Sequence, residues 1–422
     1  MPRTPGAQGS GALAGVPRRR QPVARRARAA IVAAIVAVSV TLSGLPIAAT
    51  SQTLPETVAT GLRNPRGLAF GPDGALYVAV AATAGLRDVR AGQHGVNASV
   101  GKTARVVRIE PGERRRAVLE NLPSIKTTYD TLGAAAIAVS GDEMYVLTSA
   151  GGRPIGDPTY DNAVLRYRTS GPAEVVANIS AFKLDRPPPS RIEDLRADVE
   201  GGVPFGMTAL DGQLYVSDGN HETITEIAPD GSMRRVIEHP TSDRVLVGLT
   251  TGPDRALYVA EFGAQPRTDA SGSITRVTLA GEQSTVWDGL TAAIGVAFGH
   301  DGAMYALEFS SGARTERTGR LLRRSSGDEV SVIAAGLNFP TALTVGPEGD
   351  VYVSESGHKA EEWTGKILRF RVAAPVAQEP RLDWQLVAGG AVAALSVAVA
   401  ALAMAIRARR VGRSHRRLPG TG

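Results

Sequence analysis

Acidic residues recur at one position of a repeated phrase. The phrase Gly-Pro-Asp-Gly-Ala-Leu-Tyr-Val-Ala, at residues 71–79, returns in degraded form five times, and the third residue after its tyrosine is acidic in four of the six copies. Carboxylates that converge at one end of neighbouring strands could bind Ca²⁺ or Mg²⁺, and such an ion could polarise a carbonyl group or activate water. The candidate metal ligands are Asp218, Glu261, Glu308 and Glu355.

The same acids also have a structural interpretation. An acid at the end of a strand often accepts hydrogen bonds from backbone N–H groups of the next turn. Val80 and Thr148 occupy the position in the first two copies, so the acid is not a fixed part of the repeat. The pattern does not identify a cofactor. The cofactor that it suggests is Ca²⁺ or another divalent cation.

Further candidates follow these acids or begin the first strand of a repeat. Two histidines and an asparagine stand within three residues of an acid, and three first strands open on short phrases that contain proline. The alternative interpretation is solvated loop histidines and ordinary turns. Among the opening residues, Arg66 carries a charge that could bind an anion. The candidates for a binding face are Arg66, Phe205, Asn220, His221, Phe339 and His358.

Familiar catalytic motifs do not occur in the sequence. Residues 95–103 resemble a P-loop but have five intervening residues instead of four, and residues 218–222 begin like an EF-hand loop that lacks its glycine. No HExxH or GxSxG motif occurs. The absence of cysteine excludes disulfides, zinc ribbons and thiol nucleophiles.

The repeat itself predicts the architecture. Its tyrosines, at positions 77, 145, 215, 258, 305 and 352, are 68, 70, 43, 47 and 47 residues apart. A unit of about 45 residues is typical of a four-stranded propeller blade. In the clearest copy, short β-branched runs at 249–251, 256–260, 274–277 and 284–287 predict the four strands. We therefore expect an all-β, six-bladed β-propeller over residues 54–371, without helices.

The last unit lacks an outer strand of its own. Residues 56–59, just before the first repeat, can supply that strand and close the ring. The insertions fall almost wholly in loops that share one face of such a ring, which favours this face for binding. The alternative is that one face simply tolerates insertion. These insertions are residues 80–103, 149–161, 180–202, 262–271, 309–318 and 356–364.

Several phrases resemble the ScyD/ScyE family of exported propeller proteins. They lie at residues 61–74, 203–227, 296–302 and 336–354, and the resemblance covers about residues 54–371. The same phrases are similar to NHL-repeat and gluconolactonase-like propellers. The ScyD/ScyE resemblance implies an exported six-bladed propeller and no particular activity.

The gluconolactonase resemblance implies metal-dependent lactonase chemistry only if other acids converge on a metal ion, because the first two copies of the repeat lack their acid. Quinone-dependent sugar dehydrogenases resemble the fold too, but we assign no His/Arg set to that chemistry.

Both ends of the chain carry localisation signals. Residues 1–49 combine an arginine-rich start with an uncharged run at 29–48, which predicts a signal peptide or, alternatively, an uncleaved anchor. Residues 385–406 form a second uncharged run, long enough to span a bilayer. The basic tail, residues 407–422, holds six arginines and is therefore expected in the cytoplasm. Residues 372–384 would form a stalk that holds the propeller outside.

The ends also account for the basic character of the chain. They hold 13 of its 47 Lys and Arg residues and none of its 41 acids, which leaves residues 50–384 with a formal charge of −7. We therefore expect no nucleic-acid partner. The expected partners are the cytoplasmic membrane, through the C-terminal helix, and an unknown surface ligand or protein. The predicted function is a membrane-anchored binding or scaffolding module; the alternative is a divalent-metal hydrolase of lactone or ester bonds.

Overall fold

The structure, a computed structural model, describes most of the predicted propeller. It describes residues 54–83, 87–91, 96–110, 112, 114–127, 130–149, 152–153, 156–168, 172–187, 201–237, 245–263, 268–311, 317–358 and 364–372. The predicted signal peptide, transmembrane helix and basic tail lie outside these residues, as does the stalk beyond Val372. Within the described ranges, no helix combines the length and apolarity needed to cross a membrane.

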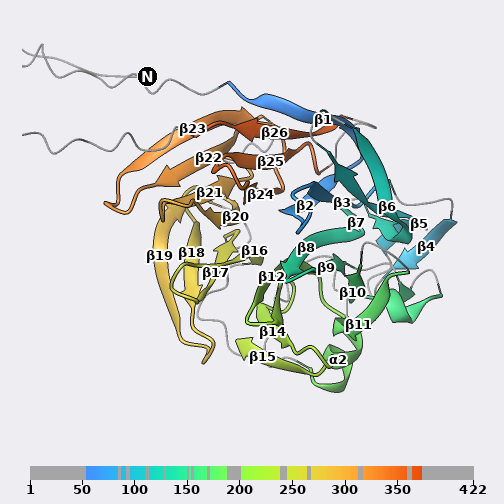
Figure 1. Cartoon of the computed structure of the whole chain (residues 1–422). Helices are drawn as coiled ribbons and strands as arrows, with labels where there is room; N and C mark the ends of the chain where they lie inside the picture. The colour runs from blue at the N-terminus through green and yellow to red at the C-terminus, as the bar shows by residue number, and fades with distance from the viewer. Residues whose placement is uncertain are drawn as a thin grey trace, which may run out of the picture. The chain divides into compact units, whose positions relative to one another are not determined.

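Six antiparallel sheets are arranged in a ring, as Figure 1 shows. Their inner strands line a central pocket, which we call the channel. Blade 1 contains β2 (Pro65–Phe70), β3 (Leu76–Val80), β5 (Val96–Ile109) and β6 (Arg115–Lys126), with β4 (Arg87–Ala91) beside β5 and β7 (Thr131–Leu132) beside β6. Blade 2 contains β8 (Ala134–Ser140), β9 (Glu143–Thr148), β10 (Ala163–Tyr167) and β11 (Glu174–Asn178). Blade 3 contains β12 (Pro204–Leu210), β13 (Gln213–Asp218), β14 (Thr223–Ile227) and β15 (Met233–Ile237).

The remaining blades follow the same order. Blade 4 contains β16 (Leu246–Thr251), β17 (Leu257–Glu261), β18 (Gly272–Val277) and β19 (Gln283–Leu290). Blade 5 contains β20 (Ala293–Phe298), β21 (Met304–Glu308), β22 (Gly319–Arg324) and β23 (Val330–Leu337). Blade 6 contains β24 (Ala342–Val345), β25 (Val351–Glu355), β26 (Gly365–Phe370) and β1 (Glu56–Leu62). The prediction of an all-β, six-bladed propeller is confirmed.

The two ends of the propeller sequence pair in blade 6. Strand β1 runs antiparallel to β26, with Glu56 opposite Arg369. The predicted ring closure is therefore present. Two hydroxyl groups of blade 6 also bond to the backbone of blade 1: Thr341 Oγ1 donates to Pro65 O at 2.7 Å, and Ser354 Oγ donates to Arg66 O at 2.6 Å. The pairing covers the edge of β26, which would otherwise be open.

Small residues allow the six inner strands to approach one another around the channel. A Cβ atom added at Gly67 would lie 2.7 Å from the Cα atom of Ala136, and one added at Gly248 would lie 2.5 Å from the carbonyl oxygen of Ile294. Neither distance can accommodate a side chain, so glycine is required at both positions. Residues of all six inner strands line the channel.

In blade 1 the repeated tyrosine supports the tight turn at the far end of the blade. Tyr77 donates a hydrogen bond to Asp73 Oδ2 at 2.9 Å, and Arg108 Nε donates to the same oxygen at 2.9 Å. Burial and the bond to Asp73 raise the pKa of Tyr77. Similar pairs between a turn acid and a third-strand arginine recur at Asp254–Arg276, Asp301–Arg323 and Asp350–Arg369. The repeat phrase is thus explained by one recurring polar contact.

Within the described residues, one α-helix interrupts the all-β pattern. Helix α2 (Ile179–Asp185) follows β11, and a short 3₁₀ helix, η2 (Pro158–Tyr160), precedes β10. The expectation of a domain without helices is wrong here, because seven residues are too few to show a helical period. The side chain of Asn178 begins α2 by accepting a hydrogen bond from the N–H of Ala181 at 2.8 Å.

Candidate functional site at the mouth of the channel

The ends of the second strands lie beside the beginnings of the first strands. In blade 6 the N–H of Ser356 donates to Asn338 O at 2.8 Å, and in blade 5 the N–H of Phe309 donates to Ala292 O at 2.9 Å. Equivalent bonds occur in the other four blades. Both groups of sequence candidates therefore belong to the same end of the propeller, the end that carries the insertions.

Side chains of blades 1 and 6 meet at this end on a single carboxylate. Asp130, which precedes β7, accepts a hydrogen bond from Arg66 Nη2 at 2.5 Å, and its Oδ1 atom lies 2.9 Å from Nδ1 of His358. Arg66 Nη2 also donates to the carbonyl oxygen of Thr131 at 2.7 Å. Arg66 begins β2 in blade 1, and His358 follows β25 in blade 6. We call Arg66, Asp130 and His358, together with the neighbouring rings of Phe262, Phe309 and Phe339, the channel mouth.

Charge stabilises the Asp130 carboxylate in this position. Burial alone would raise its pKa, but Arg66 and the contact with His358 outweigh burial and lower the pKa to about 2. Arg66 is itself buried, with 5% of its surface exposed. A buried guanidinium requires such a partner, since an unpaired buried charge is costly. Asp130 and Arg66 thus form a fixed ion pair at neutral pH.

Aromatic rings surround His358. The ring centres of Phe309 and Phe339 lie 5.5 and 5.6 Å from the imidazole, edge to face, and 5.5 Å from each other. Phe262 extends the group, 5.6 Å from Phe309. Phe205 packs against the same apolar cluster and lines the channel with Arg66. The mouth therefore combines an apolar surface with one polar edge.

The backbone of Phe339 is strained. Its φ angle is +45°, in the left-handed region that bulky side chains rarely adopt. By strand register, the equivalent positions in blades 1 and 5 are Asn64 and Ala292, with φ angles of +53° and +50°, and Phe339 carries the bulkiest side chain of the three. Strained residues persist where the surrounding structure holds them, and they concentrate at functional sites. The ring of Phe339 is thus held at the mouth at a conformational cost.

The arrangement allows two kinds of chemistry. A carboxylate at Nδ1 fixes the orientation of the imidazole and leaves Nε2 as its second polar atom. A histidine held in this way can hydrogen-bond a ligand through Nε2. The rings beside it can stack on an aromatic or aliphatic group of the ligand. The mouth can therefore bind an amphipathic molecule.

The four acids proposed as metal ligands each lie in a separate blade and have local partners. Glu308 accepts a hydrogen bond from the N–H of Thr291 at 2.8 Å and from Arg320 Nε at 2.5 Å. Glu355 accepts from the N–H of Asn338 at 2.9 Å, and its Oε2 atom lies 2.7 Å from Lys366 Nζ. These contacts match the structural interpretation of the acids.

The third acid, Glu261, also has a local partner. Glu261 accepts a hydrogen bond from Ser273 Oγ at 2.6 Å. Across the described ranges, no group of three or more His, Asp or Glu side chains is placed to hold a metal ion. The donor set that the sequence suggested does not fit one divalent cation, because its members are not brought together.

Asp218 lies in a buried polar cluster. Its Oδ1 atom accepts hydrogen bonds from the N–H groups of Asn220 and His221 at 2.8 and 2.9 Å, and its Oδ2 atom lies 2.6 Å from Nζ of Lys183 in α2. Burial would raise the pKa of Asp218, but Lys183 and His221 outweigh burial and lower it. His221 is fully buried and Asn220 nearly so. Asn220 and His221 thus belong to this buried cluster and are not part of the channel mouth.

Sequence reasoning missed Asp130, Phe309 and Lys183. Asp130 lies between the first two repeats, where no repeated phrase marks it. Phe262 and Phe309 carried a usable signal, because each directly follows the acid of its repeat. Lys183 lies in the short helix that the sequence did not reveal.

Comparisons with known proteins support the fold. A comparison with models of protein families gives no match, and neither does one with curated proteins. Among solved structures, the chain is similar to a structural-genomics protein of unknown function from Bacteroides thetaiotaomicron, at 13% identity and a TM-score of 0.50, over 75% of this chain and 74% of that one. It is also similar to virginiamycin B lyase from Staphylococcus aureus, at 15% identity and a TM-score of 0.43, over 76% and 89% of the chains.

A candidate gluconolactonase is a third similar structure, at 14% identity and a TM-score of 0.44, over 79% of this chain and 96% of that one. At these identities the similarity concerns the fold alone. Membership of the ScyD/ScyE family stays a prediction.

Proposed function

We propose that this protein is a membrane-anchored, extracytoplasmic propeller that binds a ligand at the channel mouth. The observation that carries the proposal is the Asp130 carboxylate, which joins Arg66 to His358 beneath a group of phenylalanines. A scaffold without a ligand would gain little from a strained Phe339 and a partly exposed histidine at this point. The ligand class is a small amphipathic molecule with an aromatic or aliphatic part and one polar group that reaches His358.

The binding test is a thermal-shift screen of the full-length protein in detergent against small aromatic and acyl compounds. Compounds that bind the mouth should raise the melting temperature of the wild type and lose this effect in His358→Gln. His300→Gln is the matched control, because His300 is exposed on a tight turn at the other end of blade 5. Compounds that stabilise all three proteins equally would refute binding at the mouth.

The anchoring proposal has a separate test. It rests on the uncharged run at 385–406 and the six arginines after it. The full-length chain should stay in the membrane fraction after alkaline carbonate extraction, and a chain that ends at residue 384 should be released. Release of the full-length chain would overturn the anchor and leave the binding proposal untouched.

The alternative, a divalent-metal hydrolase, would need a different ligand set. No observation among the described residues favours it, since the four acids lie in four blades with partners of their own. We therefore derive no reaction through a metal ion.

A further inference from the structure

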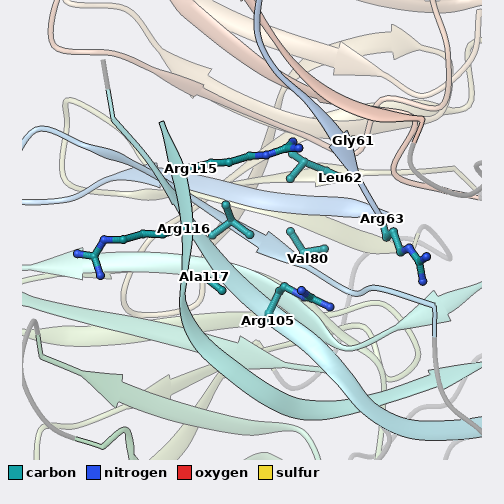
Figure 2. A pocket seen from close by; sticks show the side chains of 9 residues that line it. Gly61, Leu62, Arg63, Val80, Arg105, Arg115, Arg116 and Ala117 are labelled. Carbon is teal, nitrogen blue, oxygen red and sulfur yellow. The ribbon is translucent and has the colours of Figure 1, made fainter. Parts of the chain in front are cut away.

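A groove lined by four arginines lies where blade 6 joins blade 1. Its residues come from the end of β1, the end of β3 and the outer strands β5 and β6. The floor is apolar: Leu62, Val80 and Val107 are buried beneath it. Figure 2 shows Arg63, Arg105 and Arg115 around Leu62 and Val80, whereas the side chain of Arg116 extends in another direction. The groove is separate from the channel mouth, since they share no lining residue.

Arg105, one of these arginines, has only a long and exposed ion pair among the described residues. Its Nη1 atom lies 4.0 Å from Oε1 of Glu120, and the Glu120 side chain is 59% exposed. By contrast, the third-strand arginines at the tight turns have a guanidinium nitrogen 2.5 to 2.9 Å from a carboxylate oxygen. Residues 50–384 carry an excess of acids, so the lack of a close partner here is a local feature.

The repeat explains why Arg105 lacks an acid opposite it on the second strand. In blades 5 and 6 the acid that ends the second strand pairs with the cation opposite it on the third strand, as Glu308 does with Arg320 and Glu355 with Lys366. Arg105 occupies that third-strand position in blade 1, directly opposite Val80. Blade 1 therefore keeps the cation and replaces its acid by an apolar residue.

Local backbone features direct two arginines into the groove. The pairing of β5 with β6 shifts register on both sides of Arg105, which re-aims a side chain. The guanidinium of Arg115 lies over Gly61, where an added Cβ would be 3.3 Å from Nη2. Gly61 also has a φ angle of +64°, a conformation suited to glycine. The absence of a side chain there lets Arg115 reach the floor.

We propose that this groove binds an organic oxyanion, a phosphate or sulfate ester, with the charged group between Arg105 and Arg115 and the organic part on Leu62 and Val80. Guanidinium groups bind such oxyanions through paired, charge-assisted hydrogen bonds. The apolar floor selects an ester over the free inorganic ion, because burial of the organic part adds to the affinity. The site is additional to the proposed function and does not depend on it.

Calorimetry on the full-length protein at low ionic strength tests the site with phenyl phosphate, phenyl sulfate, inorganic phosphate and phenol. We expect the esters to bind at least tenfold more tightly than inorganic phosphate or phenol, and the tighter ester identifies the oxyanion. Binding of inorganic phosphate with the affinity of the esters, or of no anion at all, would overturn the proposal.

Two variants of one residue give the sharpest control. Val80→Glu should pair with Arg105 as Glu308 pairs with Arg320, and should weaken ester binding at least tenfold. Val80→Gln has the same shape without the charge. It loses the apolar contact of Val80 as well, so it should bind the esters less tightly than the wild type but at least threefold more tightly than Val80→Glu. Equal affinities in the two variants would refute the role of Arg105.

A second pair of variants covers the case in which Val80→Glu does not fold. The double variant Arg105→Gln/Arg115→Gln should weaken ester binding at least tenfold, while Arg114→Gln, an exposed neighbour outside the groove, should not change it. Melting temperatures close to that of the wild type would show that both proteins are folded. Undiminished binding by the double variant would overturn the site.

Discussion

Arg66 and His358, from the two ends of the propeller sequence, contact the same oxygen atom of Asp130. Arg66 opens the first repeat and His358 follows the second strand of the last one, so the contact forms only when the ring closes. Asp130 comes from the connection between blades 1 and 2. Assembly of the channel mouth and closure of the propeller are therefore coupled.

Removal of the Asp130 charge should destabilise the fold. Asp130→Asn leaves the buried Arg66 without its counter-ion, and the loss of one partner of a buried pair costs about 3 kcal/mol or more. Because Asp130 is 24% exposed, we expect about 2 kcal/mol, measured by urea unfolding. The control is Asp211→Asn, which breaks an exposed pair with Arg255 and should cost less than about 1 kcal/mol. Equal effects of the two variants would contradict the account.

The same ion pair should make stability depend on pH in the acid range. The pKa of Asp130 is about 2 in the folded protein, below its usual value of 3.8. Its contribution is therefore present above pH of about 4 and is lost as the pH falls toward about 2. Unfolding free energies of the wild type should converge on those of Asp130→Asn over this interval. A constant difference between the two proteins would show that the carboxylate does not titrate as described.

The strain at Phe339 should be visible in a comparison of two aromatic variants. Phe309→Ala removes a buried ring and should cost about 3 to 5 kcal/mol. Phe339→Gly also removes a ring, but relief of the positive φ angle offsets about 1 kcal/mol of the cost. Urea unfolding should therefore rank Phe339→Gly as the milder change, while both variants lose mouth ligands. The reverse ranking would argue against strain at Phe339.

The four repeat acids should not determine metal content. Glu308 is engaged with Arg320 and Glu261 with Ser273, so neither is directed at a shared ion. Glu261→Gln/Glu308→Gln should therefore have the same divalent-metal content as the wild type by elemental analysis. A stoichiometric ion that is present in the wild type and lost in the double variant would restore the metal interpretation.

The fold was largely predictable because the repeat is local. Five of the six tyrosines stand four residues after a turn acid, as Tyr77 does after Asp73, and Tyr352 repeats the contact with Glu348. Ring closure by the segment after Leu54 was predictable as well, because the last repeat visibly lacked a strand. Helix α2 was not, since seven residues show no period.

The site was less predictable because its contacts are not local. Arg66, Phe339 and His358 were identified from their position in the repeat, and the structure brings them together. The link between them, Asp130, lies outside any repeat, and nothing in its neighbourhood distinguishes it from a surface acid. The four acids occupy the same position in their repeats, which suggested that their side chains meet at one site. Matching positions in different blades are, however, spread around the ring.

The most direct test of the channel mouth is a crystallographic fragment soak of the full-length protein with small aromatic and acyl compounds. The account predicts electron density for bound fragments in contact with His358 and Phe309. Fragments that bind reproducibly elsewhere on the propeller, with none at the mouth, would contradict it.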